Sequence, residues 1–396
     1  MPAHSLLFSA RHLSIVTLNC SLMSTKKRAA RKSATKSAAK KSVALASKSG
    51  ALARRARAVT LVTGGTGFLG THLVEQLIEE GAASVRVMAG SVPRRLIEMG
   101  AEPIEGSITN PEDVRRALAG VTEIYHLAGR VSRAQEDGRE MMAIHVDGTR
   151  LLCEAARAAG VKSIVMASTS GTIAVTASGE EIPDESWPPP LDIIARWPYY
   201  ASKYYQEQVA LENFSGRGPR LVIMNPSLLL GPRDERLSST KVILDFLARK
   251  INAVPSGGLS FVDVRDVATA FRAAMREGKH GERYLLGSAN WTFEKFFGRL
   301  ERISKTPGPR LSLPKSFAVA GSKLVSTLFR QWNMASPVEA EAVEMAEYFW
   351  YLDDGKARSE LGFTPRDPAE TLNDTIVYVR ENFLGGDAFK SATSNK

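Results

Sequence analysis

A tyrosine and a lysine four residues apart are the clearest candidates for catalytic chemistry in this sequence. Tyr199 and Lys203 share one face if the segment is helical, and Pro198 directly before them is typical of a helix start. A tyrosine hydroxyl has a pKa near ~10, and a close ammonium group lowers it by stabilising the phenolate. The pair could therefore donate a proton to a carbonyl oxygen, or accept one from an alcohol, while a hydride moves at the carbon.

Three hydroxyl side chains precede this pair, directly after the apolar run Ser163–Ala167. If that run is a parallel strand, Ser168, Thr169 and Ser170 follow its carboxyl end, where such sheets bind their ligands. One of these hydroxyls could hold a substrate oxygen against Tyr199. The spacing alone does not choose among the three.

A glycine-rich segment predicts a dinucleotide site. Gly64, Gly67 and Gly70 are spaced three apart, between the apolar run Val59–Thr63 and a helical pattern over 69–80. Glycine permits a tight turn and lets the backbone approach a pyrophosphate, and the helix N-terminus offers free N–H groups. The order of strand, loop and helix is the context that such a site requires. Together with the hydride chemistry inferred above, it indicates a nicotinamide dinucleotide.

The elements that must position these residues alternate in type. Short apolar runs separated by helical patterns predict an α/β fold with a Rossmann-type doubly wound parallel sheet. Helical patterns dominate after about residue 226, which predicts a smaller, mostly helical C-terminal substrate lobe. The predicted strands are Val59–Thr63, Val85–Ala89, Glu123–Leu127, Ser163–Ala167 and Leu221–Met224, and the predicted helices lie near 69–80, 111–119, 140–159, 199–213, 263–276, 292–304, 315–330 and 336–349. 

We divide the chain into a disordered basic tail (1–57), a dinucleotide-binding Rossmann domain (58–225), a substrate-binding lobe interleaved with it (226–385) and a short tail (386–396). The basic tail holds 13 of the 52 lysines and arginines and none of the 42 acidic residues. It cannot bury enough apolar surface to offset its chain entropy. It is an inert extension, a tail for nucleic acid or anionic surfaces, or an organellar transit peptide.

Composition narrows the class of protein further. No apolar run approaches the ~18 residues of a membrane span, and only Cys20 and Cys153 are present, which indicates a reducing compartment without disulfides. The histidines show no metal-ligand spacing, so we predict no metal. We expect a cytoplasmic protein, or an organellar one if the tail is a transit peptide. Its predicted partner is a small-molecule substrate; nucleic acid could bind only through the tail, and a homodimer is a possible assembly.

These pieces together resemble the extended short-chain dehydrogenase/reductase superfamily over roughly residues 58–385. The sequence is most similar to its dihydroflavonol-4-reductase-like and 3β-hydroxysteroid-dehydrogenase-like branch, near bacterial hopanoid-associated sugar epimerases. The segments that carry the resemblance are Thr63–Gly70, Tyr125–Gly129, Tyr199–Lys203, Asn225–Pro232, Phe261–Ala268, Lys356–Arg358 and Leu361–Phe363.

The resemblance implies roles for individual residues. It places the active hydroxyl of the family on Thr169, with Ser168 just before it, beside Tyr199 and Lys203. It also implies a set of cofactor contacts that includes the catalytic tyrosine and lysine. Together with the glycine segment and the end of the second predicted strand, this gives as predicted cofactor-binding residues Gly64, Gly67, Phe68, Leu69, Gly70, Ser91, Arg94, Ser107, Ile108, Leu127, Ala128, Gly129, Tyr199, Lys203, Asn225, Pro226 and Ser227.

Three features leave alternatives. His145 stands where the family has an asparagine that organises a proton-relay water, so the relay is in doubt. Ser107 stands where an acid usually contacts adenine. The aromatic run Tyr348–Tyr351 fits helix packing, with substrate lining as the alternative.

The cofactor choice depends on the end of the second predicted strand. NAD-specific enzymes carry an acid there for the ribose 2′-hydroxyl, but this chain has no acid between Glu80 and Glu98. Ser91, Arg94 and Arg95 could instead meet a 2′-phosphate. The sequence therefore favours NADP(H), with NAD(H) as the alternative.

The predicted function is that of an NAD(P)-dependent oxidoreductase acting on a ketone, aldehyde or secondary alcohol with a fairly apolar body. One alternative is a sugar-nucleotide epimerase or dehydratase with transient hydride transfer. Ser170-Gly171 after Thr169 counts against a dehydratase, which usually has an acid directly after this hydroxyl. A second alternative is a dinucleotide-sensing regulatory protein, but such sensors typically lose the Tyr/Lys pair.

Overall fold

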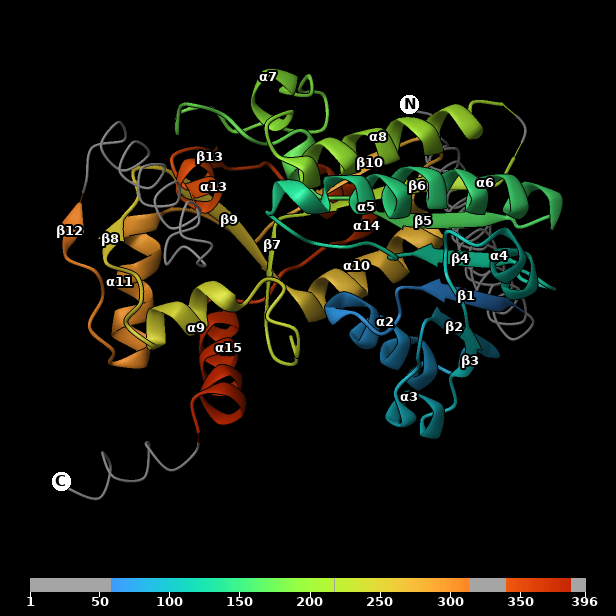
Figure 1. Cartoon of the computed structure of the whole chain (residues 1–396), viewed down its shortest axis with the longest axis horizontal. Helices are drawn as coiled ribbons and strands as arrows, with labels where there is room; N and C mark the ends of the chain where they lie inside the picture. Colours follow the sequence, from blue (N-terminus) through green and yellow to red (C-terminus); the bar gives the residue numbers. More distant parts are fainter. Residues whose placement is uncertain (1–57, 217, 313–339, 386–396) are drawn as a thin grey trace, which may run out of the picture. The chain divides into compact units, whose positions relative to one another are not determined.

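A parallel sheet of seven strands forms the centre of the computed structural model, which describes residues 58–216, 218–312 and 340–385 (Figure 1). Its strand order is β10-β6-β5-β4-β1-β2-β3. Since the order runs outward from β1 in both directions, the sheet is doubly wound, as predicted, and its switch point lies between β1 and β4. The strands are β1 (Val59–Thr63), β2 (Ser84–Ala89), β3 (Glu102–Glu105), β4 (Glu123–His126), β5 (Ser163–Ala167), β6 (Arg220–Pro226) and β10 (Arg283–Leu286).

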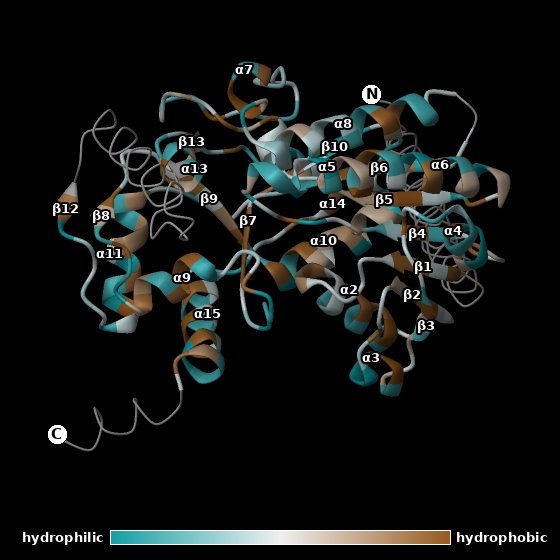
Figure 2. Ribbon diagram, viewed as in Figure 1, coloured by the Kyte–Doolittle hydropathy of each residue, from teal (hydrophilic) through white to brown (hydrophobic). Residues whose placement is uncertain are grey.

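Helices cover both faces of this sheet because side chains alternate along each strand. In β1, Leu61 packs into the core with α4, α6 and α8, while Val62 packs into the opposite core with α2, α10 and α14. Both residues are fully buried, and β1 is coloured hydrophobic in Figure 2. The helices are α2 (Phe68–Glu79), α4 (Pro111–Ala117), α6 (Gly148–Ala158), α8 (Pro198–Asn213), α10 (Val264–Glu277) and α14 (Gly355–Leu361).

A smaller C-terminal region combines helices with a second sheet that the sequence did not predict. Its central strand β9 pairs with β11 on one side and with β7 and β13 on the other, at different registers. The strands are β7 (Leu228–Leu230), β9 (Gly258–Asp263), β11 (Ala289–Thr292) and β13 (Phe349–Trp350), with a separate pair β8 (Ala253–Val254) and β12 (Leu311–Ser312). The helices are α9 (Lys241–Leu247), α11 (Phe293–Ser304), α13 (Ala340–Met345) and α15 (Pro368–Phe383).

Several predicted elements differ from those observed. The chain is a strand at Phe349–Trp350, where a helix was predicted through residue 349, because these residues pair with β9. The helix predicted over 140–159 is α5 (Gly138–Met142) and α6, joined by the π-helical turn η2 (Ala143–Asp147). The disordered tail predicted at 1–57, the helix predicted at 315–330 and the tail 386–396 lie outside the described residues.

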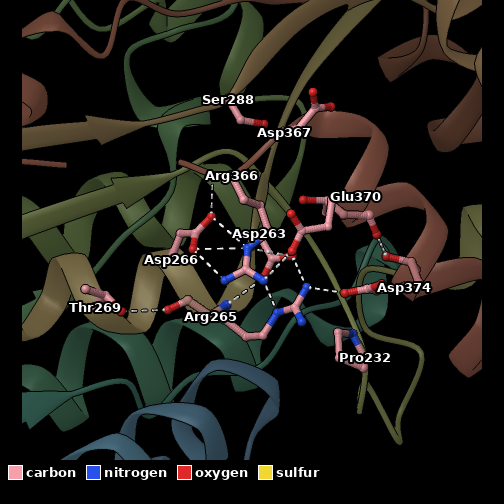
Figure 3. A network of polar contacts seen from close by, with 12 residues as sticks. Pro232, Asp263, Arg265, Asp266, Thr269, Ser288, Arg366, Asp367, Glu370 and Asp374 are labelled. Atoms are coloured by element: carbon pink, nitrogen blue, oxygen red, sulfur yellow. Dashed lines mark hydrogen bonds and ion pairs between the residues drawn. The ribbon is translucent and has the colours of Figure 1, made fainter. Parts of the chain in front are cut away.

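An ionic cluster fastens the C-terminal region together; we call Asp263, Arg265, Asp266, Arg366 and Asp374 the Asp263 cluster (Figure 3). Asp263 accepts the backbone N–H of Arg265 at 2.9 Å and so caps α10. The Arg265 guanidinium bridges Asp263 and Asp374 at 2.7 Å each, and Arg366 pairs with Asp266 at 2.8 Å. The cluster thereby joins β9 and α10 to α15.

None of the helices in the described part of the chain is both long and apolar enough to cross a membrane.

Candidate active site

The glycine-rich loop after β1 is shaped so tightly that side chains would not fit. Gly64 has a left-handed backbone (φ +70°), and a Cβ there would lie 2.6 Å from the backbone nitrogen of Ala128. A Cβ on Gly70 would collide with the carbonyl oxygen of Gly64. Gly67 is the N-cap of α2 and brings no side chain to the helix end. The loop therefore leaves the first N–H groups of α2 open to an anion such as a pyrophosphate.

The other predicted cofactor residues follow the strands at this edge of the sheet. Leu127, Ala128 and Gly129 continue β4, and the Leu127 N–H bonds the last residue of β1. Ser107 is exposed after β3, where its N–H donates to Asp113 at 3.0 Å, and Ile108 is buried beside it. Phe68 and Leu69 begin α2, Ser91 and Arg94 follow β2, and Asn225, Pro226 and Ser227 end and follow β6.

Two buried oxygens at the end of β6 fit a ligand with hydrogen-bonding groups. The amide nitrogen of Asn225 donates to the Glu207 carboxylate, the carbonyl oxygen of Thr169 and the hydroxyl of Thr172. Within the described residues, however, Asn225 Oδ1 and Ser227 Oγ are buried without a hydrogen-bond partner. Such atoms are costly unless a ligand or water satisfies them. The carboxamide of a nicotinamide has both donors and an acceptor, so these residues fit the predicted cofactor.

Tyr199 lies where the sequence placed it, in the first turn of α8. Pro198 is the first helical residue, as predicted. The half-buried Tyr199 hydroxyl shares a hydrogen bond with the Thr169 side chain, and its ring packs against Tyr200 at 5.1 Å and His145 at 6.0 Å. Burial raises the pKa of Tyr199 to about 12, although the bond with Thr169 opposes this shift.

Lys203 lies one turn further along the same helix face, but its ammonium has other partners than the phenol. Lys203 Nζ donates to the carbonyl oxygen of Ala167 at 2.6 Å and to Oε1 of Gln206. Burial lowers its pKa to about 7, with the Glu207 carboxylate opposing the shift. Lys203 therefore does not produce the expected lowering of the tyrosine pKa in this arrangement, in which only the hydrogen bond with Thr169 opposes the effect of burial.

Glu207 is a central residue of the site that the sequence analysis missed. It is fully buried, and its Oε1 accepts hydrogen bonds from Ser168, Thr172 and Asn225, the latter two at 2.9 and 2.8 Å. Its Oε2 pairs with Arg283 of β10 at 2.9 Å. Ser168 thus faces Glu207, whereas Thr169 faces Tyr199. The i, i+4 spacing from Lys203 to Glu207 was the available signal.

His145 forms a second support, from the π-helical turn η2. Its Nε2 accepts the backbone N–H of Arg130 at 3.0 Å, so Nδ1 carries the proton and donates to Ser202 Oγ at 2.8 Å. Ser202 Oγ in turn donates to the carbonyl oxygen of Tyr199 at 2.8 Å. Burial, with help from the charge of Lys203, lowers the pKa of His145 to about 2. His145 is therefore neutral, and both ring nitrogens are used within the protein.

Aromatic side chains adjoin Tyr199. Tyr200 packs on Trp350 with ring centroids 4.8 Å apart, and Trp197 packs on Trp350 and Tyr348 at 5.8 and 5.6 Å. Gly171, just after the three hydroxyl residues that follow β5, lies so close that a Cβ would be 2.9 Å from the Trp350 ring. We call Trp197, Tyr200, Tyr348 and Trp350 the aromatic wall.

Comparisons with known proteins agree with this geometry. Residues 60–287 match the model of the NAD dependent epimerase/dehydratase family. The chain is 33% identical to a putative dihydroflavonol 4-reductase of Synechocystis, over 81% of this chain and 94% of that protein. It is 31% identical to sterol demethylase protein B of Methylococcus capsulatus, over 81% and 98% of the two chains.

A solved structure extends the likeness to three dimensions. The crystal structure of gox2253 is 31% identical, with a TM-score of 0.71 over 82% of this chain and 98% of that one. The resemblance predicted from the motifs is thereby confirmed. This chain belongs to the NAD dependent epimerase/dehydratase family and is an NAD(P)-dependent oxidoreductase of the extended short-chain type.

Proposed function

We propose that this enzyme interconverts a ketone or aldehyde and the corresponding alcohol on a substrate with a largely apolar body. The observation that supports this most is the Tyr199–Thr169 hydrogen bond beyond the carboxyl end of β5, with Lys203 one helical turn away. One hydroxyl can hold a substrate oxygen while the other exchanges a proton with it.

The proposed mechanism uses three side chains and the cofactor site. The glycine loop and α2 would hold the pyrophosphate, and Asn225 and Ser227 would meet the nicotinamide, which supplies or accepts the hydride when bound. In reduction, Thr169 holds the substrate oxygen and Tyr199 donates its proton to that oxygen. Lys203 stabilises the phenolate that remains. Oxidation uses the same groups in reverse.

An apolar substrate is supported by Tyr200 and Trp350, the two partly buried members of the aromatic wall, which pack on the buried Trp197 and Tyr348. Flat aromatic surfaces gain most from burying apolar area, and the relatives with dihydroflavonol reductase and sterol demethylase names act on such frameworks by those names. The epimerase alternative predicts no net change in the cofactor. Release of oxidised or reduced cofactor with a simple carbonyl or alcohol therefore separates the two functions.

We further propose that NADP(H) is preferred. The corner after β2 carries the exposed Ser91 and, as the first residue of α3 (Arg94–Glu98), Arg94 with 91% of its side chain exposed. Arg94 pairs with Glu98 at 2.7 Å. Such an exposed pair is worth only ~0–1 kcal/mol, so a ribose 2′-phosphate can replace it.

The test is a panel of carbonyls and alcohols assayed with both cofactors, on wild type, Tyr199→Phe and Tyr200→Phe. General acid catalysis contributes about 10²–10⁴-fold, so Tyr199→Phe should lose at least about a hundredfold in kcat while cofactor affinity is kept. Tyr200→Phe is the matched control, since it keeps the ring that packs on Trp350. A Tyr199→Phe enzyme with nearly normal kcat, or a wild type that leaves the cofactor unchanged, would refute the proposal.

A further inference from the structure

A chain of buried polar side chains extends from Lys203 into the protein. Gln206 is fully buried, and its Nε2 donates to Thr149 Oγ1 at 2.9 Å. Thr149 Oγ1 also lies 2.8 Å from Nε2 of His126, whose Nδ1 lies 2.7 Å from Thr63 Oγ1. Thr63 Oγ1 in turn accepts the N–H of Ala128 at 3.3 Å. The chain thus connects Lys203 with the backbone after β4, beside the glycine loop.

The chemistry of the groups fixes the orientation of the Gln206 amide. An ammonium can only donate hydrogen bonds, so the Gln206 atom facing Lys203 must be the carbonyl oxygen. The amide nitrogen then faces Thr149, which can accept. Reversing the amide would place a donor against the ammonium.

Counting hydrogen-bond donors shows how many N–H groups of Lys203 remain unused. An ammonium has three N–H donors, and two of them are used by the carbonyl oxygens of Ala167 and Gln206. One donor remains for the cofactor or for the Tyr199 side. Because both acceptors are rigidly held, they set the direction of that third donor.

We propose that Gln206 is a positioning residue that holds the Lys203 ammonium through an uncharged acceptor, so that its third N–H and its charge stay available to the reaction. This inference rests on the proposed function of the site. A neutral amide suits the task because a carboxylate in the same place would pair with the ammonium and cancel its charge.

The other charged or titratable groups around Lys203 are either paired elsewhere or neutral, so none of them takes the role proposed for Gln206. Glu207, one turn further on, already accepts three hydrogen bonds and pairs with Arg283. His126 and His145 face Lys203 from β4 and η2, and burial lowers the pKa of these histidines to about 3 and about 2, so both are neutral. Tyr199, on the same helix face, has its pKa raised and is a neutral phenol.

The experiment compares Gln206→Glu and Gln206→Met with the matched controls Gln208→Glu and Gln208→Met. Gln208 is half-buried on the same helix, two residues on, and so projects from a different side. The first readout is the titration midpoint of Lys203, followed by NMR in full-length protein with ¹³C-labelled lysine. The signal is assigned from its loss in Lys203→Met, and no substrate is needed.

Gln206→Glu should raise the Lys203 midpoint by about 1–3 pH units, because an opposite charge then lies in contact with the ammonium. Gln206→Met should lower the midpoint, because a hydrogen bond to the charged form is lost. The Gln208 variants should leave it unchanged. If Gln206→Met does not fold, the Gln206→Glu titration still decides. A Lys203 midpoint that is the same in wild type and in the folded Gln206 variants would overturn the inference.

The second readout is the pH profile of kcat with any substrate found active. The part of the pH profile that follows the titration of Lys203 should shift with the NMR midpoint in each variant. Gln206→Met should also lose about tenfold in kcat at neutral pH, comparable to one lost charge-assisted hydrogen bond. A kcat profile that stays fixed while the NMR midpoint moves would also overturn the positioning role. Absence of turnover in wild type would instead count against the proposed function, and the NMR result would stand by itself.

Discussion

Two polar clusters in this enzyme, each centred on buried side chains, are built in opposite ways. In the Asp263 cluster every charge has a partner. The Asp263 carboxylate accepts hydrogen bonds from the side chain and the backbone N–H of Arg265, and the Arg366 guanidinium lies 3.5 Å away (Figure 3). In the cluster around Tyr199 and Lys203, groups are buried without full compensation. Asn225 Oδ1 and Ser227 Oγ lack partners within the described residues, and burial shifts the pKa values of Tyr199 and Lys203.

The difference separates structural from functional polarity. Burial by itself would raise the pKa of Asp263, but the hydrogen bonds from Arg265 and the charge of Arg366 outweigh it and lower the pKa. At Tyr199 and Lys203 burial prevails, which disfavours both charged forms. A cluster that fully satisfies its charges stabilises the fold, whereas one that leaves them unsatisfied can be completed by a ligand.

The largest effect on stability should come from Asp263→Asn. Removing one partner of a buried ion pair costs about 3–5 kcal/mol. We expect the lower end here, because Arg265 and Arg366 then face an uncharged amide but keep Asp374 and Asp266 as partners. Urea unfolding at pH 7 should show this loss, while kcat of the folded fraction stays as in wild type. A variant with normal stability but reduced kcat would reverse the distinction between the clusters.

Glu207→Gln should affect both stability and catalysis. The substitution removes the charge that pairs with Arg283 and replaces one acceptor oxygen near Ser168 and Asn225. Hydrogen bonds to a charged group are worth about 1.5–3 kcal/mol, so we expect a loss of about 2 kcal/mol in unfolding free energy together with a lower kcat. Arg283→Met is the control, since it removes the ion pair but keeps the bonds to Ser168 and Asn225. If both variants lose stability but keep the wild-type kcat, Glu207 has a structural role like that of the Asp263 cluster.

The sheet could be predicted where strands are buried on both faces. Val59–Thr63 and Ser163–Ala167 were predicted with the observed bounds, because both faces of each strand are covered and the apolar runs are continuous. β3 was missed because Pro103 and two glutamates interrupt its four residues at the sheet edge. β13 pairs with β9 across about ninety residues, and β9 pairs with β7 and β11 across about thirty, which local pattern does not reveal.

The site was predictable where its chemistry follows helix spacing. The Tyr199–Lys203 pair and the glycine loop could be read from local order, and the choice of Thr169 agrees with its bond to Tyr199. Gln206 and Glu207 were missed because an amide and a carboxylate on a helix are normally solvent-exposed. Only the packing of α8 against β4, β5 and β6 buries them, and this depends on the tertiary fold.

His145→Asn tests the hydrogen bonds from His145 through Ser202 to the backbone of Tyr199. A lost neutral hydrogen bond is worth about 1 kcal/mol, so we expect a loss of about fivefold in kcat. The pH dependence is more specific. The folded pKa of His145 lies below its unfolded value of 6.5, so the unfolded chain binds the proton first. The contribution of His145 to stability is therefore full above pH 6.5 and decreases as the pH falls.

The two clusters should thus lose stability in different pH windows. Asp263, with its pKa lowered from 3.8, contributes fully above that pH and loses its contribution only as the pH falls below it. His145→Asn should reduce the loss of unfolding free energy between pH 7 and 5, and Asp263→Asn should not. Urea unfolding at both pH values measures this, and identical slopes in wild type and His145→Asn would contradict a buried neutral histidine.

The smallest expected effect is on cofactor preference, and it distinguishes the neighbouring residues Arg94 and Arg95. As in the two clusters, the question is which charge is already paired within the protein. Arg95 pairs at 2.7 Å with the nearly buried carboxylate of Glu75, which also binds Arg233 through two hydrogen bonds of 2.5 and 2.6 Å. Arg94 has only the exposed Glu98.

Arg94 is therefore the one free to meet a 2′-phosphate, whereas Arg95 links α3 to α2. Since one exposed arginine–phosphate contact is worth about 1 kcal/mol, Arg94→Ala should lower kcat/KM for NADPH about fivefold and leave NADH unchanged. Arg95→Ala is the matched control and should leave the ratio of the two cofactors as in wild type. An equal change of the ratio in Arg95→Ala would mean that Glu75 releases Arg95 when the cofactor binds, and a wild-type preference for NADH would refute the role of both.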